Sequence, residues 1–160
     1  MNNIEKQLNT IMRCLVADTE EGRAAARKEL LEMVISNNAA AGAADLDSTI
    51  RAVLLDIGVP THLIGYPYLI TAIKAIAETP DMLRNLTGEL YPFVASQHET
   101  TSSRAERAIR HAIECAWDRG DMDTMRRYFG NTVSKYKGKT TNGEFISRVA
   151  DVVRMRLKGA

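Results

Sequence analysis

The stretch Thr100–Trp117, TTSSRAERAIRHAIECAW, carries the clearest structural signal in the chain. Its small apolar residues recur every three or four positions, which is the spacing of one side of an α-helix. Ser103 is expected to cap this helix, with Glu106 completing a capping box three residues later. The stretch is therefore predicted to be a helix with one small apolar face and one basic face. The apolar positions are Ala105, Ala108, Ile109, Ala112, Ile113 and Ala116; the basic ones are Arg104, Arg107 and His111, with Arg110 on the flank.

A helix that packs through small residues lies close to its scaffold and directs its long polar side chains outward. This arrangement suits insertion into the major groove of DNA. A short helix is predicted just before it, near Tyr91–Gln97, and the polar run HETTSS between the two predicts a tight turn. The three segments together predict a helix-turn-helix.

The distribution of charge supports a nucleic-acid partner. The 160 residues carry a formal net charge of only +1, with 45% hydrophobic and 26% charged residues, which is a globular balance. Residues 1–45 and 46–97 are each net acidic, whereas residues 98–160 hold thirteen Lys/Arg against eight Asp/Glu. Positive charge gathered in one third of a chain is typical of a nucleic-acid-binding face.

Several other classes of site and function are not indicated. Cys14 and Cys115 form no CxxC pair, and His62 and His98 lack the spacing of metal ligands, so neither zinc nor another metal is expected. The sequence shows no catalytic triad, carboxylate pair or glycine-rich phosphate loop, so we expect a non-enzyme without a cofactor. No apolar run approaches the ~20 residues of a membrane span, and a cytoplasmic location is expected.

The periodicity predicts an all-α protein, a multi-helix domain with a helix-turn-helix preceded by a short N-terminal helical hairpin. The expected divisions are a hairpin over residues 1–36, a linker over 37–45 and the main domain over 46–160. Within the hairpin, a helix over residues 3–16 is followed by one that opens at Asp18, with Glu21 completing a capping box. A hairpin cannot bury two apolar stripes alone, so it either folds back on the main domain or self-associates into a bundle.

Capping and breaking residues predict the remaining helices. The first helix of the main domain is expected to start at Asp47 or Ser48 and to end at Gly58. The last is expected to start at Thr141, with Glu144 as its capping-box partner. Between these, Pro67 suits the first turn of a helix, a further helical piece is expected around Met82–Leu86, and a short helix over Asp121–Phe129 precedes a basic loop with Lys135, Lys137 and Lys139.

Three separated segments resemble a known family. They are DLDSTIRAVLLDIGVPTHLIGYPYL, ELYPFVASQHETTSSRAERAIRHAIECAWDRG and FGNTVSKYKGKTTNGEFISRVAD, and they fall within residues 46–157. Their most specific runs are IGVP, the ERAIRHAIE core followed by AW, and TVSK followed by TN and EFI. Together they resemble the C-terminal effector domain of the stage-zero sporulation protein A family, the response regulators that initiate sporulation.

The resemblance implies an all-helical domain that binds promoter DNA, activates some genes and represses others, and sits as adjacent head-to-tail copies on repeated boxes. RNA polymerase is a further expected partner. In that family the positions matching Arg104, Glu106 and Arg107 contact base edges, and those matching Arg110, His111 and the loop near Lys139 contact phosphates. The chemistry agrees, because Arg offers two donors to guanine and Glu accepts from cytosine. We also expect phosphate contacts from Ser103, Lys135 and Lys137.

Alternatives remain open for several of these residues and for the function. Glu106 is equally suited to a purely capping role, His111 to a plain surface position, and the three lysines to an ordinary solvated loop. Residues 1–45 are too short for the receiver domain that normally precedes this effector domain, so control by aspartyl phosphorylation is not expected and the hairpin is a candidate association device. The second functional hypothesis is a protein-interaction module that modulates a full-length sporulation regulator, or another partner, through the hairpin.

Overall fold

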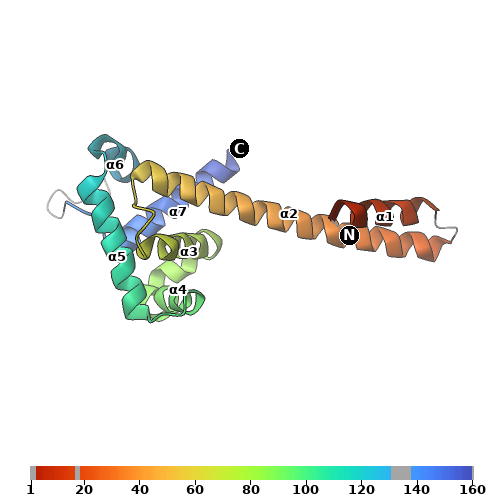
Figure 1. The fold of residues 1–160 in the computed structure, drawn as a ribbon, viewed down its shortest axis with the longest axis horizontal. Helices are drawn as coiled ribbons and strands as arrows, with labels where there is room; N and C mark the ends of the chain where they lie inside the picture. The colour runs from red at the N-terminus through yellow and green to blue at the C-terminus, as the bar shows by residue number, and fades with distance from the viewer. Residues whose placement is uncertain (1–2, 17–18, 131–137, 160) are drawn as a thin grey trace. The chain divides into compact units, whose positions relative to one another are not determined.

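The computed structural model describes residues 3–16, 19–130 and 138–159, and within these ranges it is all-α with no strand (Figure 1). The predicted fold class is therefore confirmed. The elements are α1 (Asn3–Val16), α2 (Glu20–Ile57), α3 (Gly65–Glu78), the 3₁₀ segment η1 (Pro80–Asn85), the π-helical segment η2 (Leu86–Leu90), α4 (Tyr91–Gln97), α5 (Ser102–Arg119), α6 (Met122–Phe129) and α7 (Asn142–Lys158).

Helix α2 is longer than the sequence predicts. It continues without interruption through residues 37–45, so the expected break in the helix and the expected new start at Asp47 or Ser48 are wrong. Asp47 instead accepts a hydrogen bond from Arg51 Nε at 2.8 Å, and Ser48 Oγ donates to the Asp45 carbonyl at 3.0 Å. The alanines of this stretch explain the difference, because Ala is the best helix former and needs no apolar periodicity to remain helical. Whether residues 37–45 act as a linker remains a prediction.

The chain divides into two compact units, residues 1–44 and 45–160. The first contains α1 and the N-terminal part of α2, which form the predicted hairpin. Thr19 Oγ1 accepts a hydrogen bond from Gly22 N at 3.2 Å at the start of α2, whereas the predicted cap Asp18 lies outside the described residues. Arg13 and Glu29 form an ion pair of 3.2 Å across the hairpin.

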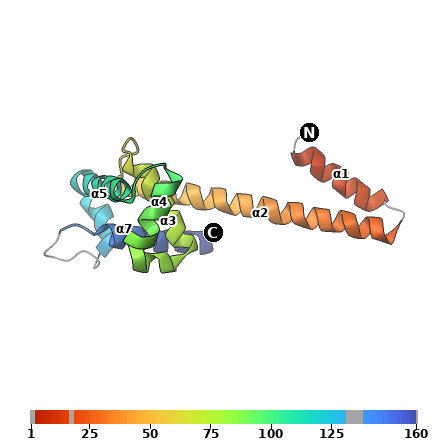
Figure 2. The same cartoon turned by 90° about the horizontal axis from the view of Figure 1, so that it is seen from below.

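The hairpin leaves much of its apolar surface uncovered. Figure 2 shows α1 and the N-terminal part of α2 diverging away from their connection. A cleft of about 770 Å³ lies between the two helices, with Met12, Val16 and Met33 among its lining residues. Large apolar side chains are exposed on both helices of this unit: Leu8, Ile11, Met12, Val16, Leu31, Val34 and Ile35.

The second unit has a continuous apolar core to which every α-helix from α2 to α7 contributes. Helix α3 packs against both α5 and α7, and α4 packs against α5 (Figure 1). The aromatic rings of Phe129 and Phe145 stack with a centroid distance of 5.0 Å, and Trp117 lies 5.5 Å from Phe129. The largest fully buried side chains are Ile50, Leu54, Ile57, Leu69, Ile73, Ile76, Leu90, Ile109, Ile113, Met125, Phe129 and Phe145.

Two predicted helix boundaries are confirmed by their hydrogen bonds. Gly58 ends α2 with a φ of 89°, in the left-handed region that glycine adopts at little cost, and the N–H groups of Gly58 and Val59 both donate to the Leu54 carbonyl. Thr141 caps α7 in a complete capping box: Thr141 N donates to Glu144 Oε2 at 2.8 Å, and Glu144 N donates to Thr141 Oγ1 at 3.3 Å.

Gly65, the first residue of α3, allows this helix to approach α5 closely. A Cβ atom at position 65 would lie 2.0 Å from the Ala108 carbonyl oxygen and 2.9 Å from the Ala112 Cβ. On the α5 side Gly65 meets two alanines, the half-buried Ala108 and the fully buried Ala112. Small residues on both sides thus determine where α5 lies on the domain.

The substitution Gly65→Ala should test this contact. The added methyl group would meet a backbone oxygen that cannot rotate away, so α3 and α5 would have to separate. We expect the free energy of unfolding to fall by about 1–3 kcal/mol, measured by urea denaturation. Gly159→Ala is the matched control, because its Cβ would lie at an ordinary 3.5 Å from the Met155 carbonyl oxygen. Equal stability of the two variants would contradict the close approach.

Candidate nucleic-acid interface

Helices α4 and α5 and the residues 98–101 between them form the helix-turn-helix that the sequence predicts. The N–H groups of His98 and Thr100 both donate to the Ala95 carbonyl, at 3.3 and 3.0 Å, which closes the turn after α4. Glu99 between them has a φ of 50°, an uncommon conformation for a residue other than glycine. The chain then reverses into α5.

The cap of α5 is Thr101 rather than Ser103. Thr101 has extended backbone angles, and its Oγ1 accepts a hydrogen bond from Arg104 N at 3.3 Å. Ser103 lies inside the first turn with its side chain exposed, so the predicted Ser103–Glu106 capping box is wrong. Each hydroxyl residue from Thr100 to Ser103 is chemically able to cap a helix. The turn after α4 selects among them, since it sets where helical backbone angles begin.

The turn is attached to α3 through His98, a residue to which the sequence assigns no role. Its Nε2 lies 2.8 Å from Thr71 Oγ1, and its ring lies 4.6 Å from the ring of Tyr68. The contact with Thr71 joins residues 27 positions apart in the chain. No local sequence pattern predicts such a contact, which depends on how α3 and the turn pack.

The predicted two faces of α5 are confirmed. Of its predicted apolar residues, Ala108 is half-buried and the others are buried, whereas Arg104, Arg107, Arg110 and His111 are exposed on the opposite side. Within the described part of the chain, the side chains of Arg104 and Arg107 make no hydrogen bond or ion pair. Two free guanidinium groups therefore lie at the first turns of the second helix of the helix-turn-helix.

Glu106 and Arg110 form an ion pair one helical turn apart. The Glu106 side chain is about one-third exposed and that of Arg110 more than half exposed. The carboxylate of Glu106 is therefore occupied by a neighbouring cation in this structure and does not cap the helix. A new partner for either side chain must therefore break this ion pair or bind alongside it.

A polar contact inside the domain joins α4, α5 and α7. Asn142, the buried first residue of α7, donates from Nδ2 to the Tyr91 hydroxyl at 3.1 Å and to the Glu106 carbonyl at 3.4 Å. Burial raises the pKa of the Tyr91 hydroxyl above its usual value, and the nearby Glu106 carboxylate acts in the same direction. The only local signal for Asn142 in the sequence is its place directly after the capping Thr141, which does not predict this contact.

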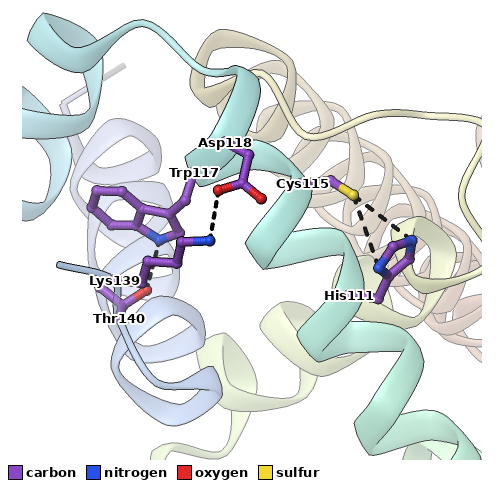
Figure 3. Close-up of polar contacts among 6 residues, drawn as sticks. All are labelled: His111, Cys115, Trp117, Asp118, Lys139 and Thr140. Carbon is purple, nitrogen blue, oxygen red and sulfur yellow. Dashed lines mark hydrogen bonds and ion pairs between the residues drawn. The ribbon is translucent and has the colours of Figure 1, made fainter. Parts of the chain in front are cut away.

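Lys139 is the one lysine of the predicted basic loop that the structure describes, since Lys135 and Lys137 lie outside the described residues. Its Nζ lies 2.6 Å from Asp118 Oδ1 near the C-terminal end of α5 (Figure 3). The hydrogen bond to Asp118 raises the pKa of the Lys139 ammonium. The residues adjacent to this pair also make contact, because Trp117 Nε1 donates to Thr140 Oγ1 at 3.1 Å. No local pattern in the sequence predicts the role of Asp118.

His111 and Cys115 lie one turn apart on the outer side of α5, with the Cys115 Sγ 3.7 and 3.9 Å from the two ring nitrogens (Figure 3). Cys115 is half-buried and forms no disulfide. Among the described residues, no group of three or more metal-ligating side chains comes together. A search of the same residues finds no helix with the length and apolar character of a membrane span.

The structure thus places the predicted contact residues of α5 on one helix, and it adds Lys139 beside the far end of that helix. Ser103, Arg104, Glu106 and Arg107 lie in its first two turns, and Arg110 and His111 follow one turn later. All of them belong to the unit that contains the helix-turn-helix.

The comparison with known families agrees with this geometry. The family model described as "Sporulation initiation factor Spo0A C terminal" matches residues 50–153, which cover most of the chain and include the helix-turn-helix and most of α7. This is a family of DNA-binding regulatory domains, not of enzymes. The resemblance seen in the sequence is confirmed, and the chain belongs to the Spo0A C-terminal family, the DNA-binding domain of sporulation initiation factors.

Proposed function

We propose that this protein is a sequence-specific transcriptional regulator that inserts α5 into the major groove of promoter boxes. The observation that carries the proposal is the exposure of the guanidinium groups of Arg104 and Arg107 at the start of α5, where neither pairs with any residue that the structure describes. The second helix of a helix-turn-helix contacts base edges through its N-terminal residues. The buried alanines on its other side support the same role, because they let the helix lie close to the domain and leave its outer face clear.

The base contacts follow from the chemistry of the first two turns. Arg104 and Arg107 each offer two parallel N–H donors, which match the O6 and N7 acceptors of guanine. Glu106 lies between them in the chain and is suited to accept from the N4 amino group of cytosine. For that contact the Glu106 carboxylate must break or loosen its ion pair with Arg110. The Arg110 guanidinium can then bind a phosphate instead. The ion pair of the free protein is thus exchanged for two contacts to DNA.

Phosphate contacts are assigned to the surrounding residues. Ser103 and His111 flank the base-contacting positions on α5, and Arg110 and Lys139 supply charge. Lys135 and Lys137 are proposed for the same role from the sequence alone. Such contacts fix the register of the helix on the duplex and do not depend on base identity.

Replacement of Arg107 should change which sequence is chosen. Removing a bidentate donor to guanine is expected to cost about 1–3 kcal/mol at one base pair of the preferred box and to relax the choice there. The preferred box is first obtained by unbiased selection of bound DNA fragments, and Arg107→Ala is then titrated against each single base-pair substitution. Arg84→Ala, an exposed arginine of η1, is the matched control and should leave the choice unchanged.

Two outcomes would contradict the proposal. If selection recovers no preferred sequence and the protein binds every duplex equally, sequence-specific regulation is ruled out. If a box is recovered but Arg107→Ala lowers affinity equally for all its variants, Arg107 contacts the backbone and the base assignment is wrong.

We further propose that the hairpin of residues 1–44 pairs with the hairpin of a second copy. Its exposed apolar residues lie on both helices, and the cleft between α1 and α2 leaves part of this surface open to another helix. Two such hairpins can form a four-helix bundle that covers both apolar surfaces. This pairing, head-to-tail contact on adjacent boxes and contact with RNA polymerase are all compatible with a regulator that acts on promoters.

A charge placed in the apolar surface of the hairpin should weaken the association. Ile35 is 66% exposed, and Ile35→Glu would put a carboxylate into the proposed bundle. We expect the dissociation constant of the dimer to rise at least tenfold in sedimentation equilibrium. Leu55→Glu is the matched control, because Leu55 is 67% exposed on the same helix within the other unit.

A wild-type chain that sediments as a monomer would contradict pairing with a second copy. If that monomer instead forms a complex with a full-length sporulation regulator that Ile35→Glu abolishes, the hairpin is an interaction module for that partner.

A further inference from the structure

Lys139 is attached to α5 by contacts on two successive residues of each segment. Its ammonium pairs with Asp118 at 2.6 Å, and Thr140 accepts a hydrogen bond from the Trp117 indole at 3.1 Å (Figure 3). Directly afterwards, Thr141 is fixed in the capping box of α7. Three consecutive residues are thus held, two by α5 and one by α7. We call the four residues Trp117, Asp118, Lys139 and Thr140 the Lys139 latch.

We infer that Asp118 and Trp117 are positioning residues, which hold the Lys139 ammonium beside α5 where it contacts a DNA phosphate. This inference rests on the proposed function, since it assigns how one of its phosphate contacts is prepared. Asp118 itself contacts no DNA in this proposal and acts through Lys139.

The position of Asp118 on α5 supports the inference. Residues seven apart lie on the same side of a helix, so Asp118 falls on the stripe that contains Arg104 and His111. At 1.5 Å per residue, about 21 Å separate residue 104 from residue 118 along the helix. This length exceeds the ~12 Å width of the major groove, so the end of α5 that carries Asp118 is expected near a phosphate backbone when its start lies among the bases.

The two contacts of the Lys139 latch, the ion pair and the hydrogen bond, differ in strength. The Lys139 and Asp118 side chains are 43% and 63% exposed, and an ion pair this open is weak by itself. Trp117 is buried in the core beside Phe129, so its indole N–H is a fixed donor. The hydrogen bond to Thr140 therefore restrains the backbone next to Lys139, and the ion pair then needs to orient only the lysine side chain.

A carboxylate beside a lysine could instead compete with the phosphate, and a double-mutant cycle separates the two roles. Four full-length proteins are each titrated with the selected DNA box: the wild type, Lys139→Ala, Asp118→Asn and the double variant. If Asp118 positions Lys139, we expect Lys139→Ala to weaken binding about three- to tenfold in the wild type and less than twofold in the Asp118→Asn background. The cycle cancels the general effect of removing one negative charge.

An equal or larger loss on Lys139→Ala in the Asp118→Asn background would overturn the inference, because it would mean that the carboxylate does not help Lys139 to bind.

Thr140→Val tests the hydrogen bond between Trp117 and Thr140 without any change of charge. Trp117 is the only tryptophan in the chain, so its indole N–H gives a single resonance in ¹H–¹⁵N spectra. We expect Thr140→Val to speed exchange of this proton with solvent and to reduce the effect of Lys139→Ala on binding. Thr61→Val, at an exposed threonine outside α5 and the Lys139 segment, is the matched control and should do neither.

The indole measurement needs no DNA, so it remains informative if the proposed function fails. Absence of any preferred box would refute sequence-specific binding. An indole proton whose exchange is unchanged by Thr140→Val would refute the latch itself.

Discussion

The position of α5 depends on the contact between Gly65 and the backbone of Ala108. A side chain at position 65 has no room beside Ala108 and Ala112 of α5, so the two helices meet almost backbone to backbone. Contacts of this kind are rigid, because backbone atoms cannot change rotamer to relieve a clash. The long arginine side chains on the outer side of α5 therefore extend from a fixed base. Their reach is set by this packing and not by contacts that they make themselves.

Polar contacts complete the placement at three points along α5. His98 holds the turn at its start against α3, Asn142 joins its second turn to α4 and α7, and Asp118 pairs with Lys139 near its end. Each contact joins segments that are distant in the chain. The helix is thus held near its start, at its second turn and near its end, which is the rigidity that the proposed contact residues on its outer face would need.

Most of the helices of the main domain could be predicted from local signals. The Gly58 end of α2, the Asp121–Phe129 helix and the Thr141 capping box each depend on a few neighbouring residues, and all three are confirmed. The prediction failed at Ser103, where four adjacent hydroxyl residues could cap the helix, and over 37–45, where a lack of apolar periodicity wrongly predicts irregular structure. Alanine forms helix without such periodicity.

The candidate site was only partly predictable for a different reason. The basic face of α5 follows from helical spacing alone, so its arginines could be placed in advance. The polar contacts that join this helix and its neighbours to distant segments could not. Asp118 lies 21 positions from Lys139, and Asn142 lies 51 positions from Tyr91. Such pairings depend on the tertiary fold, and no periodic pattern in the sequence indicates them.

The ion pairs on α5 have a consequence for how the protein responds to ionic strength. Arg104, Arg107, Arg110 and Lys139 supply four positive charges, but Glu106 and Asp118 supply two negative ones next to them, so the group has a net charge of +2. Lysine and arginine side chains that bind phosphates displace condensed counterions from DNA in proportion to the phosphate charge that they neutralise. A surface that carries its own carboxylates therefore releases fewer ions than its arginines and lysines suggest. For the proposed interface we therefore expect an affinity for DNA that is less sensitive to salt, with more of the binding free energy coming from directional contacts to the bases.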